Sequence, residues 1–212
     1  MDSISKQFTQ KIENINSLSH GIGIVFGVVS MPLLIRMANK GGNVGILVGS
    51  VVYAASFLFV FISSTVYHAL RRSTTKEIMK VVDHISIYFL IAGTYTPIIL
   101  VYVNNDFGIG LLTALWSMTM AGIFFKLFYT GKYELLSTLL YLFMGWILFI
   151  DRSAFFETIP QKVIWLIVAG GCLYSIGVIF YLWQKFTYHH VIWHIFVLAA
   201  AICHYAAILL AV

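Results

Sequence analysis

Seven apolar runs, each close to the length that a helix needs to cross a lipid bilayer, follow one another along almost the whole chain. A spanning helix uses about 20 largely apolar residues, because each residue advances it by about 1.5 Å and the hydrocarbon core is about 30 Å thick. The sequence therefore predicts an all-α fold, a seven-transmembrane helix bundle that forms one domain over residues 1–212. The predicted helices are 20–37, 44–68, 82–103, 107–129, 135–150, 163–183 and 190–212.

Composition argues against a soluble domain and against a nucleic-acid partner. Hydrophobic residues make up 60% of the chain and charged residues only 10%, whereas about a quarter of the residues of a soluble domain are charged. The net charge of +5 is not gathered into a basic stripe with interleaved contact residues. We expect a multi-pass protein of the cell membrane whose partners are membrane lipids. The sequence indicates neither a protein partner nor an oligomeric state.

The fifth run is the shortest, and its assignment decides the topology of everything after it. Tyr141 and Trp146 belong to the residue types that anchor helices at membrane interfaces, while Glu134 and Asp151 mark the two ends. Without this helix, the two later helices would cross in the opposite direction.

The first 17 residues form a separate kind of segment. Ile4, Phe8, Ile12 and Ile15 recur at helical spacing among polar residues, which predicts a short amphipathic helix at the membrane interface. The apolar run after it lacks a small-residue cleavage pattern, so we expect it to remain in the membrane as the first spanning helix.

Lysine and arginine predict that the N-terminus is cytoplasmic and the C-terminus outside, because cytoplasmic loops retain these residues. An odd number of spans agrees with that assignment. Most of the cations fall on the N-terminal side: Lys6, Lys11, Arg71, Arg72, Lys76, Lys80, Lys126, Lys132 and Lys185. The opposite side has Arg36, Lys40, Arg152 and Lys162.

Five side chains form a metal-binding pattern on this topology, since ionisable groups inside a membrane are costly and mark functional sites. His190 and His194 are four residues apart, so both rings project from one face of a helix. His68 closes the second helix with Ser64 one turn before it, and Asp83 opens the third helix after a short loop. The pattern predicts that these groups converge from helices 2, 3 and 7.

The predicted ion is Zn²⁺, bound by His68, His190 and His194, because three imidazoles with a fourth position left for water are typical of catalytic zinc sites. The Asp83 carboxylate could bind the ion directly or hold that water. Zinc lowers the pKa of bound water to about 7, and a neighbouring Asp83 would take its proton during attack on a carbonyl. Ser64 would assist by hydrogen bonding. The residues thus indicate a hydrolase mechanism within the membrane.

The remaining polar residues leave two interpretations open. Glu13, Asn16 and His20 share one helical face, and they either support the metal site from behind its ligands or make only helix-entry hydrogen bonds. We interpret the other three histidines as structural: His84, His189 and His204.

These motifs together resemble the bacterial hemolysin III proteins, within the progestin and adiponectin receptor family and the wider superfamily that includes alkaline ceramidases. The resemblance implies a seven-helix bundle with zinc on the three histidines, an Asp linked to the metal through water, and a cytoplasmic N-terminus. Superfamily relatives hydrolyse lipid amides, which implies an acyl-lipid substrate. The motifs are ExxNxxxH from Glu13 to His20, SxxxH from Ser64 to His68, DHISIYFLIAGTYTP from Asp83 to Pro97, and HxxxH from His190 to His194.

The sequence leaves several functions to be weighed. The first is a zinc-dependent membrane hydrolase of lipid amide or ester bonds. The second is a non-enzymatic, lipid-responsive regulator or sensor of membrane composition and energetics, in which zinc is structural. An ion or proton pathway needs polar residues across the bilayer, and few lie beyond His204. A pore-forming hemolysin would need a soluble, secreted form, which this composition opposes.

Overall fold

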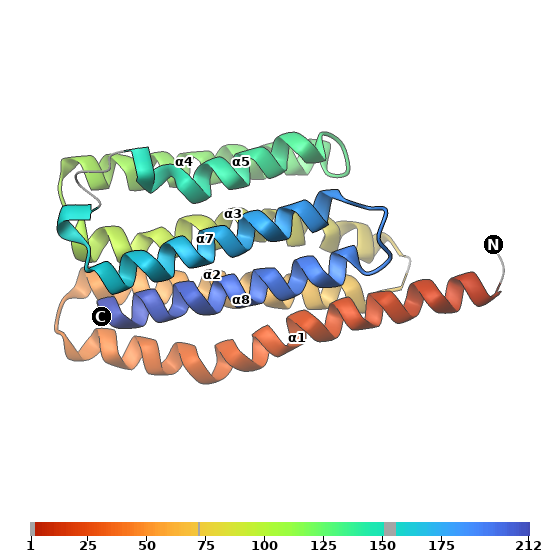
Figure 1. The fold of residues 1–212 in the computed structure, drawn as a ribbon, viewed down its shortest axis with the longest axis horizontal. Coiled ribbons are helices and arrows are strands. Elements are labelled where there is room, and N and C mark those ends of the chain that lie inside the picture. The colour runs from red at the N-terminus through yellow and green to blue at the C-terminus, as the bar shows by residue number, and fades with distance from the viewer. Residues whose placement is uncertain (1–2, 72, 151–155) are drawn as a thin grey trace.

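Helices account for nearly all of the chain that the computed structural model describes, which is residues 3–71, 73–150 and 156–212. They lie side by side with their long axes roughly aligned (Figure 1). No strand occurs in these residues, so the prediction of an all-α fold is confirmed. The helices are α1 Ser3–Lys40, α2 Val44–Ala69, α3 Thr74–Tyr102, α4 Asp106–Tyr129, α5 Glu134–Trp146 continuing as the 3₁₀ turn η1 Ile147–Ile150, α7 Gln161–Leu182 and α8 His189–Ala211.

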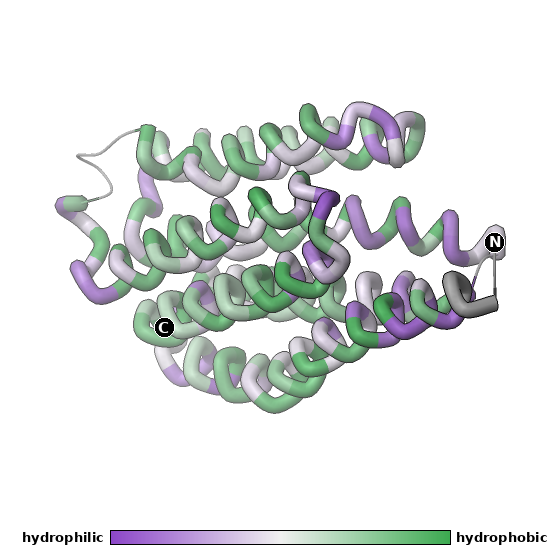
Figure 2. Tube along the Cα trace, turned by 45° about the vertical axis from the view of Figure 1, so that its right-hand side comes forward, coloured by the Kyte–Doolittle hydropathy of each residue, from purple (hydrophilic) through white to green (hydrophobic). Residues whose placement is uncertain are grey.

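Six of the helices within the described residues are long and apolar enough to cross a membrane: those of α1, α2, α3, α4, α7 and α8. The fifth apolar segment, Glu134–Ile150, is shorter, and its assignment as a span stays a prediction. Apolar residues dominate the middle of the bundle, whereas hydrophilic residues gather toward its ends (Figure 2). A surface of this kind suits a lipid environment.

The two termini lie at opposite ends of the bundle (Figure 1). Which end faces the cytoplasm is not fixed by the fold and stays a prediction. Two cations of the charge count, Arg72 and Arg152, lie outside the described residues. So does Asp151, which marks the end of the fifth apolar run.

The N-terminal segment is helical and runs without a break into the first apolar helix. At about 1.5 Å per residue, the 38 residues of α1 give a length of about 57 Å, well beyond the thickness of the hydrocarbon core. Its first turns project past the other helices (Figure 1). Phe8 remains exposed there, so the interfacial location of this segment stays a prediction.

Small residues allow α2 and α3 to approach each other closely. A Cβ added at Gly93 would lie 2.4 Å from the Ser56 Oγ atom, and one added at Gly49 would lie 2.9 Å from the Pro97 Cα atom. Close approach through small residues is a common basis for helix association in membranes. This contact holds α2 beside α3, and therefore fixes where the end of α2 stands relative to the start of α3.

The Gly49 contact yields a stability prediction. Gly49→Val is expected to lower the free energy of unfolding by about 1–3 kcal/mol, because the backbone of Pro97 cannot rotate away from the new side chain. Gly110→Val is the matched control, since a Cβ at that helical glycine meets nothing within 4 Å. Unfolding in detergent measures both variants. Equal losses would show that helix propensity, not close packing, explains the effect.

The site lies where four helix segments meet at one end of the bundle. α2 ends at Ala69, and α3 begins after Ser73, whose side chain accepts a hydrogen bond from the backbone N–H of Lys76. α1 crosses beside α2, where the Ser17 hydroxyl donates to the backbone carbonyl of Thr65 at 3.0 Å. The first turn of α8 completes the group.

Candidate metal centre

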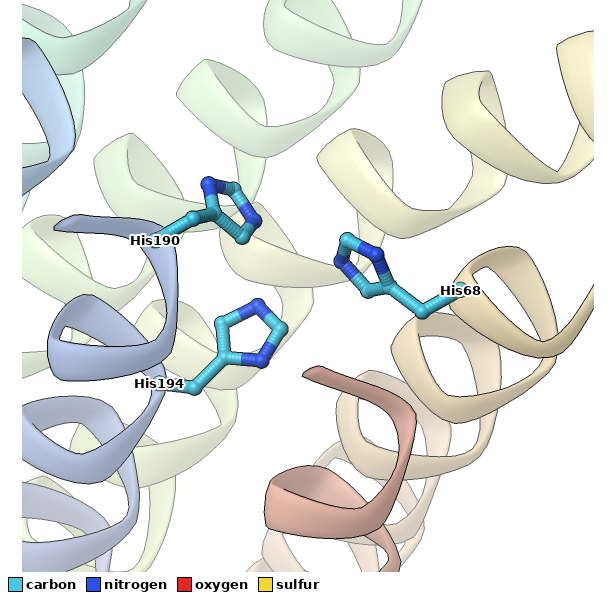
Figure 3. A group of neighbouring side chains, drawn as sticks. All are labelled: His68, His190 and His194. Atoms are coloured by element: carbon cyan, nitrogen blue, oxygen red, sulfur yellow. The ribbon is translucent and has the colours of Figure 1, made fainter. Parts of the chain in front are cut away.

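Three histidines from two helices bring their ring nitrogens together in the interior of the protein. One nitrogen of each of His68, His190 and His194 lies within 4.8 Å of the other two. His68 and His194 are only 3% and 2% exposed, and His190 is partly buried. The rings point toward one another across the space between α2 and α8 (Figure 3).

Helix geometry explains this convergence. His190 and His194 lie one turn apart on the same face of α8, and their ring centroids are 4.6 Å apart. His68 lies in the last turn of α2, and its ring centroid is 5.1 Å from that of His190 and 4.9 Å from that of His194. The predicted meeting of the HxxxH pair with His68 is therefore found in the structure.

Helix α1 supplies contacts behind two of these rings. The Nδ1 atom of His194 lies 3.2 Å from the backbone carbonyl of Asn16 and 3.1 Å from the Ser19 hydroxyl. A carbonyl oxygen can only accept, so Nδ1 carries the hydrogen and the lone pair is at Nε2. The Nδ1 atom of His68 lies 3.0 Å from the Glu13 Oε2 atom.

The arrangement fits a metal ion held by three imidazoles. His68 Nε2 is buried and has no hydrogen-bond partner among the described residues, which is costly unless a ligand occupies that direction. Zinc–nitrogen bonds of about 2.0–2.1 Å in a tetrahedron separate the nitrogens by about 3.3 Å. The three nitrogens lie within 4.8 Å of one another, so they would need to approach one another by at most about 1.5 Å to bind one zinc ion. Identification of the ion as zinc stays a proposal.

Asp83 and Ser64 are both buried near this end of the bundle, but neither belongs to the group of converging donors. Ser64 is one turn from His68 on α2. The prediction that Asp83 opens the third helix is wrong, because α3 already begins at Thr74 and Asp83 lies well inside it. Hydropathy did not reveal these first turns, since they are polar. The backbone carbonyl of Asp83 accepts from the Ser86 hydroxyl at 2.6 Å. The predicted link from Asp83 to the metal through water, and the assistance by Ser64, remain proposals.

The α1 motif lies against the histidine group, while its role stays a prediction. The Glu13 carboxylate and the backbone carbonyl of Asn16 each contact a ligand-type histidine, and the Asn16 side-chain oxygen has no partner among the described residues. The ring of His20 stacks on that of His194 with centroids 3.7 Å apart, and neither of its nitrogens has a partner among the described residues. All three residues therefore face the histidine group.

The other three histidines lie outside the converging group, and their structural role stays a prediction. His189 Nδ1 is 3.1 Å from the carbonyl of Phe180, and His204 Nε2 is 3.2 Å from the carbonyl of Ile167. The backbone carbonyl of His84 accepts from the Tyr141 hydroxyl.

Two contact residues were not singled out from the sequence. Ser19 reaches His194, and Lys76 donates to Glu13 Oε2 at 2.9 Å. Ser19 carries no spacing signal of its own, and Lys76 was counted only as one of many cations. Both contacts depend on how α1 packs against α8 and α3, which no local pattern reports.

Comparison with known proteins gives the family that the sequence motifs resemble, and it does so over nearly the whole chain. The model of the family described as "Haemolysin-III related" matches residues 8–205. The "Hemolysin-3 homolog" of Bacillus subtilis (strain 168) is 38% identical over 202 residues, which cover 95% of each protein. "Hemolysin-3" of Bacillus cereus is 36% identical over 191 residues, 90% of this chain and 87% of that protein.

A more distant likeness extends to animal proteins. The human "Monocyte to macrophage differentiation factor" is 27% identical over 199 residues, 91% of this chain and 81% of that protein. No solved structure gives a significant match. The apolar helices and the bacterial relatives together identify a multi-pass membrane protein. Because the family model spans nearly all of its residues, the chain belongs to the haemolysin III family.

Proposed function

We propose that this protein is a zinc-dependent hydrolase of amide or ester bonds in membrane lipids. The observation that carries the proposal is the buried group of three imidazole donors within 4.8 Å of one another, with α1 contacts on the Nδ1 atoms of two of them. Three protein ligands leave a fourth position for water or substrate, which is the arrangement of catalytic rather than structural zinc sites.

In this mechanism a bound zinc ion supplies Lewis acidity and activates water at neutral pH. His68, His190 and His194 would hold the ion, and the Asp83 carboxylate would take the proton of the attacking water. Ser64 would donate its hydroxyl hydrogen to the carbonyl oxygen that gains negative charge. The proton held by Asp83 would then pass to the leaving amine or alcohol.

A cavity inside the bundle supports a lipid substrate; none of the three converging histidines lines it, but it shares α8 with two of them. It is lined mainly by apolar side chains from α2, α3, α5, α7 and α8. Trp193 precedes His194 on α8, Val197 lies one turn beyond it, and His204 lines the cavity further along that helix. An apolar chain placed there would carry its carbonyl toward the histidine end.

The test is turnover of acyl lipids by purified, zinc-loaded protein. We expect release of fatty acid from at least one lipid amide or ester, measured by mass spectrometry across a panel of chain lengths. Val197→Trp is expected to reduce turnover of long-chain lipids by about tenfold or more, because the indole fills a cavity that must bury the chain. His189→Ala, outside the cavity and the donor group, is the matched control.

If no acyl lipid is hydrolysed while Asp83→Ala leaves cells unchanged, the hydrolase proposal is wrong.

One observation favours a second candidate, a lipid-responsive regulator with a structural zinc. His20 is 3% exposed, stacks on His194, and has two unpartnered nitrogens among the described residues. If α1 shifts so that His20 becomes a fourth ligand, the zinc site closes and carries no water. Four imidazoles around zinc would favour this candidate over the hydrolase.

A further inference from the structure

The Glu13 carboxylate joins three helices. Its Oε2 atom lies 3.0 Å from His68 Nδ1 and 2.9 Å from the Lys76 Nζ atom. Three helices therefore meet at one oxygen: α1 through Glu13, α2 through His68 and α3 through Lys76. The carboxylate is only 26% exposed, and a charge that is partly withdrawn from water requires compensating contacts of this kind.

The contact with Glu13 decides which nitrogen of His68 is free. A carboxylate accepts hydrogen bonds, so the hydrogen of the neutral His68 ring lies on Nδ1. The lone pair is then at Nε2, which is the buried nitrogen without a partner among the described residues. Metal-binding histidines commonly bind a carboxylate or carbonyl through the other nitrogen, which fixes the ring and raises its basicity.

Lys76 holds the carboxylate in this orientation. Its ammonium group donates to Glu13 Oε2 and, at 3.0 Å, to the backbone carbonyl of Leu70 just beyond α2. It also lies 4.9 Å from the centroid of the Tyr67 ring. These contacts tie Lys76 to the end of α2 that carries His68. The ammonium group therefore keeps the Glu13 carboxylate close to the His68 ring.

We propose that Glu13 is the positioning residue of the metal centre, which presents His68 Nε2 to the ion by binding the opposite nitrogen. The inference rests on the proposed metal centre. It adds to the three ligands a residue that binds one of them but not the ion. Glu13 acts through His68 and does not itself touch the ion. In this account α1 is part of the metal site, because the backbone carbonyl of Asn16 accepts from His194 Nδ1 as the Glu13 carboxylate accepts from His68 Nδ1.

The test measures zinc affinity by competition with a chelator. Glu13→Gln is expected to raise the dissociation constant by about tenfold and Glu13→Leu by about 100-fold, the range for loss of an outer partner. Glu77→Gln is the matched control, because Glu77 is exposed, lies in α3, and undergoes the same chemical change. We expect it to bind zinc as the unsubstituted protein does.

Two further measurements separate positioning from a structural role. Metal-free Glu13→Gln is expected to melt close to the metal-free parent, while the rise in melting temperature on adding zinc becomes smaller. Lys76→Met, which removes the ion pair but leaves the His68 contact, is expected to weaken zinc binding less than Glu13→Leu does. Zinc affinity unchanged in Glu13→Leu, or a stability loss in the metal-free variant as large as in the loaded one, would overturn the inference. A parent protein that binds no zinc would instead refute the metal centre itself.

Discussion

His194→Ala is expected to reduce bound zinc in the purified protein from about one ion per chain to nearly none. His194 is one of three converging donors and the most buried of them. Loss of one ligand from three leaves two imidazoles, too few to hold zinc tightly. Metal analysis of the untagged protein measures the effect.

The control for this variant is His204→Ala on the same helix. His204 is also an imidazole, but its Nε2 lies beside the carbonyl of Ile167, away from the converging donors. We expect its zinc content to match the parent. Retention of zinc in His194→Ala, or equal losses in both variants, would contradict the assignment of the ligands.

Asp83→Asn is expected to lower lipid hydrolysis by about 10²- to 10⁴-fold while zinc content stays unchanged. The substitution preserves size but removes the group proposed to take the proton from water, and general base catalysis contributes about that factor. Asp83 is buried in α3. Turnover and metal content should be measured on the same preparation.

Glu77→Gln, on an exposed position of α3, is the control for removal of a carboxylate from that helix. Unchanged hydrolysis in Asp83→Asn would refute its role as base. Loss of zinc together with activity would show that Asp83 is a direct ligand, which would contradict the proposed link through water.

Helix positions were predicted well from the sequence, because apolar length alone specifies a membrane span. The predicted helix 107–129 corresponds to α4 at Asp106–Tyr129, and 163–183 corresponds to α7 at Gln161–Leu182. The sequence predicted a helix in the first 17 residues but not its unbroken continuation into the first apolar helix, because hydropathy reports only the apolar part of α1. The fifth span was predicted from the sequence and stays a prediction, because α5 with its 3₁₀ turn is short.

The histidine group was predicted because helical periodicity and depth in the membrane are both visible in a sequence. HxxxH places His190 and His194 on one face, and the topology brings the end of α2 to the same depth. The Glu13–His68 contact was not predictable in this way. It depends on the rotation of α1 against α2, which side-chain packing over the whole length of both helices determines.

X-ray absorption at the zinc edge, on purified protein prepared without a histidine tag and checked for bound metal, tests the central claim most directly. We expect about one zinc per chain, with three imidazole nitrogens and one oxygen at about 2.0 Å. A well-folded protein without metal, or zinc held by four imidazoles, would contradict the account of a water-bearing zinc centre on His68, His190 and His194.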